Sequence, residues 1–503
     1  MAFSVASIFS DNMVLQKGKN VAVWGEAEDG AVITAGINGV SAKAKAKDGR
    51  WQIALPPMEY GGSYELTVRC GSETKTFTNV MVGEVWLCGG QSNMELELQN
   101  CKGGEEVLKE LTPDCNVRFY YTQKRAIIDE QFLENERNSC WAEAGSEASK
   151  CWSAVGFFFG RKLARELGVT VGLIGCNWGG TSASAWVDRP TLENSRETLS
   201  YIEEYEKGIE GKSVEQQIAE YDAYQEEFRR WNELAAEKVY KDDPHADWDK
   251  VEKIIGKNPW PGPINCKNEY RPCGLFETMI MRICPYTIKG FLYYQGESDD
   301  HKPDSYYKLF TNLIALWREK WGDDELPFII TQLPMFRYAH DVDKKHWCVI
   351  REAQMRAFKT VKNTGIAVIT DCGELDNIHP TDKVPVGERL CLQAEKLFYG
   401  MDVDAFGPIF RTAVANDGGF ELYFDHVEGG FDVKTETIDG FEIAGEDGEF
   451  KPAQAEIAGE TIFVKCGEIA EPASVRYDWS NYIVPSLYGK NNIPVAPFRT
   501  DRG

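Results

Sequence analysis

Residues 84–98 read EVWLCGGQSNMELEL, where a serine follows a diglycine at the point where an apolar run becomes amphipathic. The apolar residues 85–88 predict a buried parallel strand. Gly89 and Gly90 permit a tight turn that would place Ser92 at the carboxyl edge of this strand. The Ser92 N–H would then lie at a helix start, which favours negative charge. This pattern predicts a nucleophile, although a serine in such a loop also serves as a cap or turn residue.

A second polar loop follows a second apolar run. Residues 365–370 read GIAVIT and predict a strand, and residues 371–380 then read DCGELDNIHP. The spacing lets the Asp376 carboxylate accept a hydrogen bond from His379 Nδ1, which leaves Nε2 free to take a proton from a serine hydroxyl. The alternative is that Asp376 caps a helix and that His379 is a surface residue.

Two more predicted strands end in polar tips. Residues 171–185 read VGLIGCNWGGTSASA, and residues 290–299 read GFLYYQGESD. Backbone N–H groups at Gly179 or Gly180 and the side-chain amide of Gln295 suit an oxyanion hole. The sequence does not decide between the two glycines, and each tip is also compatible with an ordinary turn. Because open α/β sheets gather their chemistry at strand carboxyl ends, four such tips predict one shared site.

Four blocks together resemble the sialate O-acetylesterase family, part of the SGNH (GDSL-like) hydrolase superfamily: GQSNM at 90–94, NWGGT at 177–181, YYQGESD at 293–299 and DNIHP at 376–380. The opening IFSDNMVLQ at 8–16 and the closing PVAPFRTD at 494–501 resemble the family's ends as well. The resemblance covers nearly the whole chain outside residues 191–259.

The resemblance implies a catalytic triad of Ser92 as nucleophile, His379 as general base and Asp376 as the acid that orients the histidine. It also implies an oxyanion hole made by the N–H of Ser92, the N–H of Gly180 and the side chain of Gln295. Many members of the superfamily carry an asparagine where this chain has Gln295. The weaker candidates for substrate contact are Gln91, Asn93, Asn177, Trp178 and Glu297, of which Asn93 and Glu297 are expected mainly to position loops.

The pattern of elements predicts an α/β protein with three domains. Residues 1–80 alternate apolar and polar positions and predict an antiparallel β domain. Residues 81–400 alternate strands and helices, as in the three-layer parallel-sheet core of SGNH hydrolases, with a helical insertion at about 190–260. Residues 401–503 predict a second β domain, and we expect the two β domains to pack into one sandwich.

The net charge is −24 and the isoelectric point is near 4.8, which argues against a nucleic-acid or anionic-membrane partner. No run approaches the roughly twenty apolar residues of a membrane span. No signal peptide is visible, so we expect a cytoplasmic location. If the substrate is an anionic sugar, a local cation must compensate at the site, and the candidates are Arg351, Arg337 and Arg282.

Fourteen cysteines are sparse in 503 residues, and none forms a C-x-x-C pair. They are expected to be free thiols, which favours a reducing compartment. No histidine pair has the spacing of metal ligands, so neither a metal nor another cofactor is expected.

These observations predict a serine esterase that removes acetyl groups from sugar hydroxyls by two-step acyl transfer. The favoured substrate is 9-O-acetylated sialic acid. The alternative is an acetylated hemicellulose oligosaccharide from xylan, xyloglucan or mannan, and a noncatalytic carbohydrate-binding protein is a third possibility. The sequence does not indicate the oligomeric state.

Overall fold

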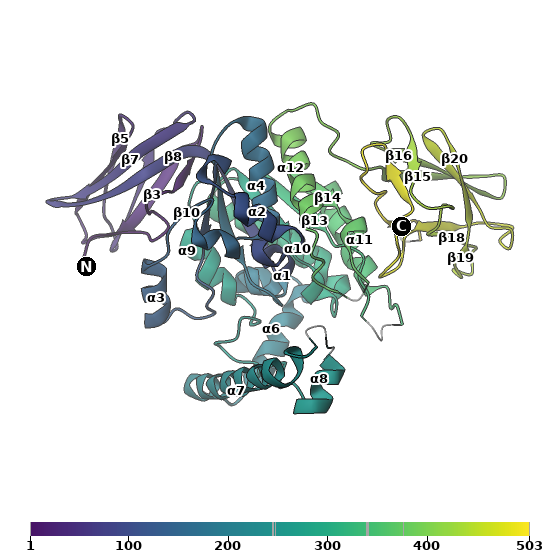
Figure 1. Cartoon of the computed structure of the whole chain (residues 1–503), viewed down its shortest axis with the longest axis horizontal. Helices are drawn as coiled ribbons and strands as arrows, with labels where there is room; N and C mark the ends of the chain where they lie inside the picture. Colours follow the sequence, from purple (N-terminus) through teal and green to yellow (C-terminus); the bar gives the residue numbers. More distant parts are fainter. Residues whose placement is uncertain (1, 244–245, 247, 339–341, 376, 502–503) are drawn as a thin grey trace. The chain divides into compact units, whose positions relative to one another are not determined.

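The computed structural model describes residues 2–243, 246, 248–338, 342–375 and 377–501. The chain divides into two compact units. The first comprises Met1–Thr122, Glu136–Ala183 and Ile283–Gly503, and the second comprises Gln123–Asn135 and Ser184–Arg282. The first unit combines sheets with helices (Figure 1), which confirms the prediction of a mixed α/β protein.

A mainly parallel sheet lies at the centre of the first unit. Its strands follow the order β10 (Ala142–Glu143), β9 (Val117–Tyr121), β11 (Val171–Asn177), β8 (Glu73–Gly90), β12 (Gly290–Tyr294), β13 (Phe328–Gln332) and β14 (Thr364–Val368). Every pair is parallel except β10 with β9. All residues of β11 to β14 are buried, which explains why these segments are nearly continuous apolar runs.

Long amphipathic helices connect these strands, and they pack in two pairs, α4 (Ala154–Leu167) with α12 (Val384–Phe398) and α10 (Pro303–Trp321) with α11 (His346–Thr360). The sequence fixes their ends. The Ser153 side chain accepts a hydrogen bond from Gly156 N at 3.0 Å to cap α4, and Gly168 ends that helix with φ +67°. Shorter helices are α1 (Ser92–Glu95), α2 (Gly104–Glu110), α3 (Glu130–Arg137) and α9 (Met281–Ile283). None of the helices in the described ranges combines the length and apolarity of a membrane span.

Part of the N-terminal β region joins the parallel sheet through β8, which is 18 residues long. Its first part pairs antiparallel with β7 (Gly61–Cys70), and its last part lies parallel to β11 and β12. The same sheet includes β2 (Val14–Gln16), β4 (Val32–Ile37) and β5 (Val40–Lys45). A separate antiparallel sheet is formed by β1 (Ser4–Val5), β3 (Val21–Glu26) and β6 (Arg50–Leu55). The boundary predicted at residue 80 therefore falls inside one strand, and the division into three domains stays a prediction.

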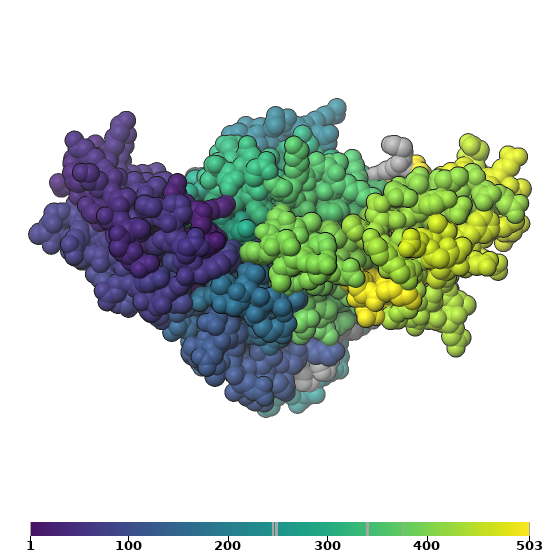
Figure 2. Space-filling view, turned by 90° about the horizontal axis from the view of Figure 1, so that it is seen from above, coloured from purple at the N-terminus to yellow at the C-terminus, as the bar shows by residue number. Residues whose placement is uncertain are grey.

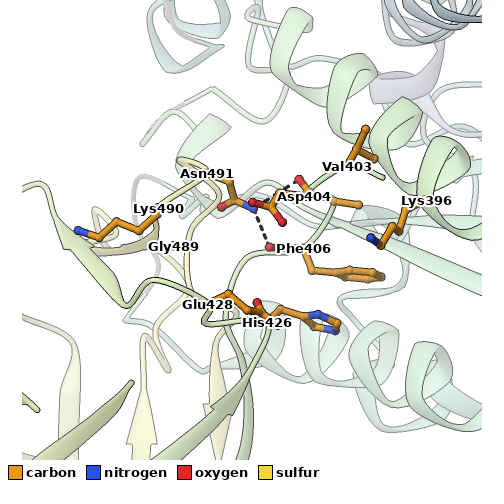
Figure 3. Close-up of a pocket in the computed structure, with 10 residues that line it drawn as sticks. Lys396, Val403, Asp404, Phe406, His426, Glu428, Gly489, Lys490 and Asn491 are labelled. Carbon is orange, nitrogen blue, oxygen red and sulfur yellow. Dashed lines mark hydrogen bonds between the residues drawn. The ribbon is translucent and has the colours of Figure 1, made fainter. Parts of the chain in front are cut away.

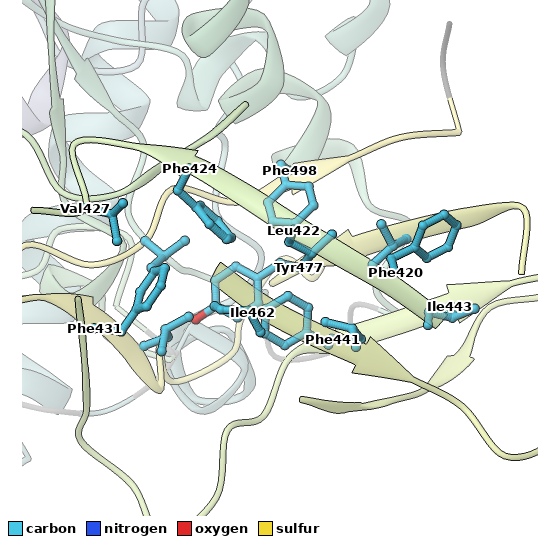
Figure 4. Close-up of a cluster of buried hydrophobic side chains, with 14 of the residues drawn as sticks. Phe420, Leu422, Phe424, Val427, Phe431, Phe441, Ile443, Ile462, Tyr477 and Phe498 are labelled. Atoms are coloured by element: carbon cyan, nitrogen blue, oxygen red, sulfur yellow. The ribbon is translucent and has the colours of Figure 1, made fainter. Parts of the chain in front are cut away.

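The C-terminal strands form three small antiparallel sheets. These are β15 (Ile409–Asn416), β16 (Gly419–Asp425), β21 (Thr461–Lys465) and β20 (Gln454–Ala458); then β19 (Lys451–Pro452), β18 (Phe441–Ala444), β22 (Ser474–Tyr477) and β24 (Phe498–Arg499); and the pair β17 (Phe431–Val433) and β23 (Leu487–Gly489). Figure 4 shows aromatic side chains gathered between these strands, and the rings of Phe410 and Phe498 stack with centroids 3.9 Å apart.

The expected single sandwich of both β regions is not confirmed. Across the described strands, none before Gly90 pairs with one after Ile409. Figure 2 shows the purple N-terminal and yellow C-terminal residues as two separate groups. The reason is chain connection: β8 anchors the first group at the amino ends of the parallel strands, whereas the second group follows α12.

A cavity of about 120 Å³ lies between the segment after α12 and the C-terminal strands (Figure 3). The Phe406 and His426 rings stack there with centroids 4.4 Å apart. Asn491 Nδ2 donates to the backbone oxygen of Phe406 at 2.7 Å. None of the predicted site residues lines this cavity.

The second unit is helical and has a small core of its own. Its helices are α5 (Arg189–Glu193), α6 (Arg196–Ile209), α7 (Val214–Ala235) and α8 (Trp248–Ile255). Ser213 and Gln216 form a capping box at the start of α7. The Trp231 indole packs with Val239 and Val251 and donates to Gly256 O at 2.9 Å. The helical insertion predicted at about 190–260 lies inside this unit.

Candidate active site

Ser92 lies where β8 passes into α1, as the sequence predicts. Gly90 has φ +136°, and a side chain there would come within 2.0 Å of Tyr294 O on the neighbouring strand. Only glycine therefore allows the two strand ends to approach so closely. Gln91 N donates to Tyr294 O at 3.1 Å, which fixes the turn, and Ser92 follows as the first residue of α1, half-buried.

His379 reaches the same point from the loop after β14. Its Nε2 atom lies 2.8 Å from Ser92 Oγ, a hydrogen-bonding distance. The loop is held by its own side chains: Asn377 Oδ1 accepts from His379 N at 3.0 Å, and Glu374 Oε1 accepts from Thr381 N at 2.9 Å. Asp376, the predicted orienting acid, lies outside the described residues.

The electrostatics around His379 favour its neutral form. Burial by neighbouring protein atoms lowers the pKa of His379 below its ordinary 6.5, even though part of the residue stays exposed. The Lys383 ammonium lowers this pKa further, and Glu95 opposes the shift. A neutral imidazole is the form that accepts a proton from a serine hydroxyl.

The two glycines after β11 differ in their hydrogen bonds. Gly179 N donates to Glu95 Oε2 at 2.6 Å, so this N–H is already used. A side chain at Gly179 would come within 3.2 Å of Ser92 Cβ, which places the glycine tightly against the serine. Gly180 is exposed and has φ +73°. The Gly179 N–H is therefore the less suitable of the two candidates for an oxyanion hole.

Gln295 makes internal hydrogen bonds that compete with its predicted role as an oxyanion donor. The residue is fully buried, and its Nε2 atom donates to Thr181 O at 3.2 Å and to Asp299 Oδ2 at 2.6 Å. An amide nitrogen has two hydrogens, so both are used. Its Oε1 atom accepts from Tyr306 at 3.2 Å. The amide therefore joins loops instead of facing a substrate, because its neighbours take up its hydrogen bonds.

Four of the five weaker candidates for substrate contact are buried, namely Gln91, Asn93, Asn177 and Glu297. Gln91 Oε1 accepts from Gly296 N at 3.3 Å, and Asn177 Nδ2 donates to Cys88 O at 3.1 Å. These side chains fix loops in the described structure. Trp178 is half-exposed beside Gly179 and keeps a surface for a ligand.

The three candidate arginines lie in different surroundings. Arg351 is buried and bonds to the backbone oxygens of Ser480 and, at 3.3 Å, Pro334. Arg282 belongs to the second unit. Arg337 is exposed, and its backbone N–H donates to Leu375 O at 3.3 Å. Arg337 is thus the candidate attached to the loop that carries His379.

Known carbohydrate esterases resemble this chain. Residues 267–395 match the family described as "Carbohydrate esterase, sialic acid-specific acetylesterase". The chain is 28% identical to mouse sialate O-acetylesterase over 465 residues, which is 84% of this chain and 79% of the relative. It is 29% identical to the human sialate O-acetylesterase over 80% of this chain and 72% of that protein.

A solved structure matches the fold throughout. A carbohydrate acetylesterase from Xanthomonas citri superposes with a TM-score of 0.78 at 28% identity, covering 99% of this chain and 100% of the other. The chain is similar to sialate O-acetylesterases over most of its length. Together with the matched carbohydrate esterase region and the solved acetylesterase structure, this similarity shows that the chain is a carboxylic-ester hydrolase.

Three polar residues near the site of this esterase were not predicted from the sequence. Asp299 accepts from Gln295, from Ser182 Oγ at 2.6 Å and from Ala183 N at 2.9 Å, which fixes the loop after β11. Glu95 binds Gly179 N, as described above. Lys383 is fully buried and donates to Asn93 Oδ1 at 2.6 Å. A lysine at a helix start resembles a solvated cation in sequence, so only the fold identifies this contact.

All fourteen cysteines of the esterase are free thiols, as predicted. Within the described part of the chain, no group of three or more His, Cys, Asp or Glu side chains is arranged to hold a metal ion.

Proposed function

We propose that the esterase removes acetyl groups from sugar hydroxyls by two-step acyl transfer. The observation that carries this proposal is the 2.8 Å contact between Ser92 Oγ and His379 Nε2. Ser92 attacks the acetyl carbonyl carbon while His379 takes its proton. The tetrahedral intermediate collapses, and the sugar hydroxyl leaves with that proton. Water then attacks the acetyl-Ser92 ester in the same way and releases acetate.

The oxyanion hole in this proposal consists of the backbone N–H groups of Ser92 and Gly180. Ser92 is the first residue of α1, where an N–H has no partner within the helix. Gly180 is favoured over Gly179 because the Gly179 N–H binds Glu95. Each such donor contributes about a hundred- to a thousand-fold in rate.

Asp376 remains the proposed orienting acid of His379. Support comes from the resemblance of the DNIHP block to the family and from the short loop that contains it. Glu374 and Asn377 hold both sides of this loop by hydrogen bonds, and Asn377 Nδ2 donates to Glu374 Oε2 at 2.9 Å.

We further propose that the core is the three-layer SGNH arrangement. The α4–α12 and α10–α11 pairs both pack on the parallel sheet, and one pair on each face would complete three layers. Ser92, Gly180 and His379 then meet at the carboxyl ends of the strands, where ligands bind in open α/β sheets.

The proposed substrate is a 9-O-acetylated sialic acid, which carries a carboxylate. Because the chain has a net charge of −24, its overall field opposes an anionic sugar. Arg337 supports the proposal because it is exposed and its backbone bonds to Leu375, four residues before His379. A guanidinium binds carboxylates in a bidentate manner. An acetylated hemicellulose fragment is the alternative, since Trp178 offers a surface for any pyranose ring.

Acetate release tests both parts of the proposal. We expect the esterase to act faster on 9-O-acetylated sialic acid than on acetylated xylo-oligosaccharide. Arg337→Gln should reduce kcat/KM about tenfold on the sialic acid and leave the neutral substrate unchanged, whereas Arg411→Gln, a change at another exposed arginine, should alter neither. Preference for the neutral substrate would favour the hemicellulose alternative. No release from either substrate would contradict the sugar acetylesterase function.

A further inference from the structure

A buried lysine lies directly behind the proposed catalytic pair. Lys383 has no exposed surface, and its Nζ atom donates to Asn93 Oδ1 at 2.6 Å. The ammonium also lies 5.3 Å from the centroid of the Tyr294 ring. Burying an ammonium is unfavourable unless the protein stabilises the charge, so the contacts of Lys383 need an explanation.

Asn93 links this lysine to both halves of the site. Its Nδ2 atom donates to Glu297 Oε1 at 2.7 Å and to Ile378 O at 2.9 Å. Asn93 directly follows Ser92, and Ile378 directly precedes His379. One amide therefore ties the serine turn to the histidine loop, and Lys383 and Glu297 hold that amide from either side.

The charges in this network face one another in a buried space. Burial raises the pKa of Glu297 to about 7 and lowers that of Lys383 to about 8. The Oε2 atom of Glu297 is buried without a hydrogen-bond partner in the described structure, which further disfavours the ionised carboxylate. The other titratable groups that face the ammonium are Glu374, Cys372 and Cys101.

The ammonium also acts on the catalytic imidazole. The charged groups facing His379 within the described residues are Lys383, which lowers its pKa, and Glu95, which raises it. A nearby positive charge disfavours the imidazolium, so it extends the pH range over which the base is neutral.

We propose that Lys383 is a positioning residue of this esterase: through Asn93 it holds the Ser92 turn against the His379 loop, and its buried ammonium opposes protonation of the His379 imidazole. The inference rests on the proposed roles of Ser92 and His379. The proposal contains two effects: the positioning of the Ser92 turn and the action of the charge on His379. Different substitutions remove each of them.

The test is the pH profile of kcat/KM with p-nitrophenyl acetate. Lys383→Gln keeps a donor for Asn93 but removes the charge. The acidic limb of the profile, where kcat/KM falls as His379 gains a proton, should therefore move to higher pH by about 0.5 to 1 unit. The plateau value of kcat/KM should change less than about threefold. Lys383→Met removes both the donor and the charge, so the limb should move equally and the plateau should also fall about tenfold or more. Lys383→Arg keeps the charge and should keep the wild-type limb.

Two controls separate these effects from general damage. Lys396→Gln changes an exposed lysine on the same helix and should leave the profile unchanged. Glu297→Gln should leave the acidic limb in place, because a carboxyl with a pKa of about 7 is already protonated there. A limb that moves as far in Glu297→Gln as in Lys383→Gln would overturn the charge effect.

An unmoved limb in folded Lys383→Gln and Lys383→Met would overturn the inference. If these variants do not fold, Lys383→Arg decides, because an acidic limb that moves in this charge-keeping variant contradicts it. Ser92→Ala separates this result from the proposed function. If Ser92→Ala is inactive and the limb is unmoved, the inference alone fails; if Ser92→Ala stays active, the proposed function fails.

Discussion

The loops after the neighbouring strands β8 and β12 look alike in sequence, yet they differ in which polar side chains are placed to react with a substrate. Both begin at a buried strand and carry a serine, an amide and an acid within a few residues. After β8, Ser92 is half-buried and contacts His379. After β12, Gln295 is fully buried and bonds to Thr181 and Asp299.

This difference teaches that a polar side chain at a strand tip is available for chemistry only when its neighbours do not use its hydrogen bonds. The β12 loop supports the site without facing it, because it holds the loop after β11 through Asp299. The β8 loop presents its serine because Gly90 lets the chain turn beside Tyr294.

The largest effect that would sharpen this comparison is expected for Ser92→Ala. It should lower kcat more than roughly ten-thousand-fold, because it removes the nucleophile. The midpoint of urea unfolding should stay nearly unchanged, since a half-exposed oxygen leaves little cavity. Ser298→Ala is the matched control in the β12 loop and should keep near wild-type turnover. Equal losses in both variants would remove the distinction between the loops.

The next effect is expected for Asp376→Asn, on the loop that completes the site. The amide can hold the wrong tautomer of His379, so kcat should fall by about four orders of magnitude with little change in KM. Steady-state kinetics measure both constants. Near-normal turnover would mean that another carboxylate orients the imidazole.

Gln295→Ala tests the β12 loop directly. We expect a loss of about 1 to 3 kcal/mol in the free energy of unfolding, because Asp299 and Thr181 O lose a buried donor. Turnover of the folded enzyme should fall less than about tenfold. A drop of a hundredfold or more in kcat at unchanged stability would restore Gln295 to the oxyanion hole.

The pH dependence gives a smaller effect. Because the pKa of His379 lies below its ordinary 6.5, the neutral form predominates at pH 6.5 and the protonated form predominates only at lower pH. Activity should therefore be constant near neutrality and fall through a single titration below pH 6.5. A midpoint of kcat/KM above pH 7 would contradict the charge environment described for His379.

The smallest effect is expected from metal removal. Each proposed step uses side chains and backbone groups of this chain, so dialysis against EDTA should leave the rate of acetate release unchanged. A loss that added zinc or calcium restores would require a different mechanism.

Much of the fold was predictable because its signals are local. The apolar runs before Ser92, Asn177, Gln295 and Asp371 each form a parallel strand, and the polar tips gather at one edge. The continuation of β8 across residue 80 was not predictable, because composition changes there while the strand does not.

The site was less predictable wherever long-range partners decide it. Lys383 and Asn93 are 290 residues apart, so no local pattern indicates their contact. The hydrogen bonds of Gln295 depend likewise on Thr181, which is 114 residues away. Residue types at strand tips identify candidates, and only their packing decides which of them stay available.

Mass spectrometry of the acid-quenched enzyme tests the central claim most directly. During turnover of an acetylated sugar, the acetyl group should appear on the peptide that contains Ser92 and should be absent from Ser92→Ala. In His379→Ala, the acetyl-Ser92 ester should accumulate only if the first step, the attack of Ser92 on the acetyl group, still proceeds. An acetyl group on another side chain, or turnover in Ser92→Ala at the wild-type rate, would contradict the account.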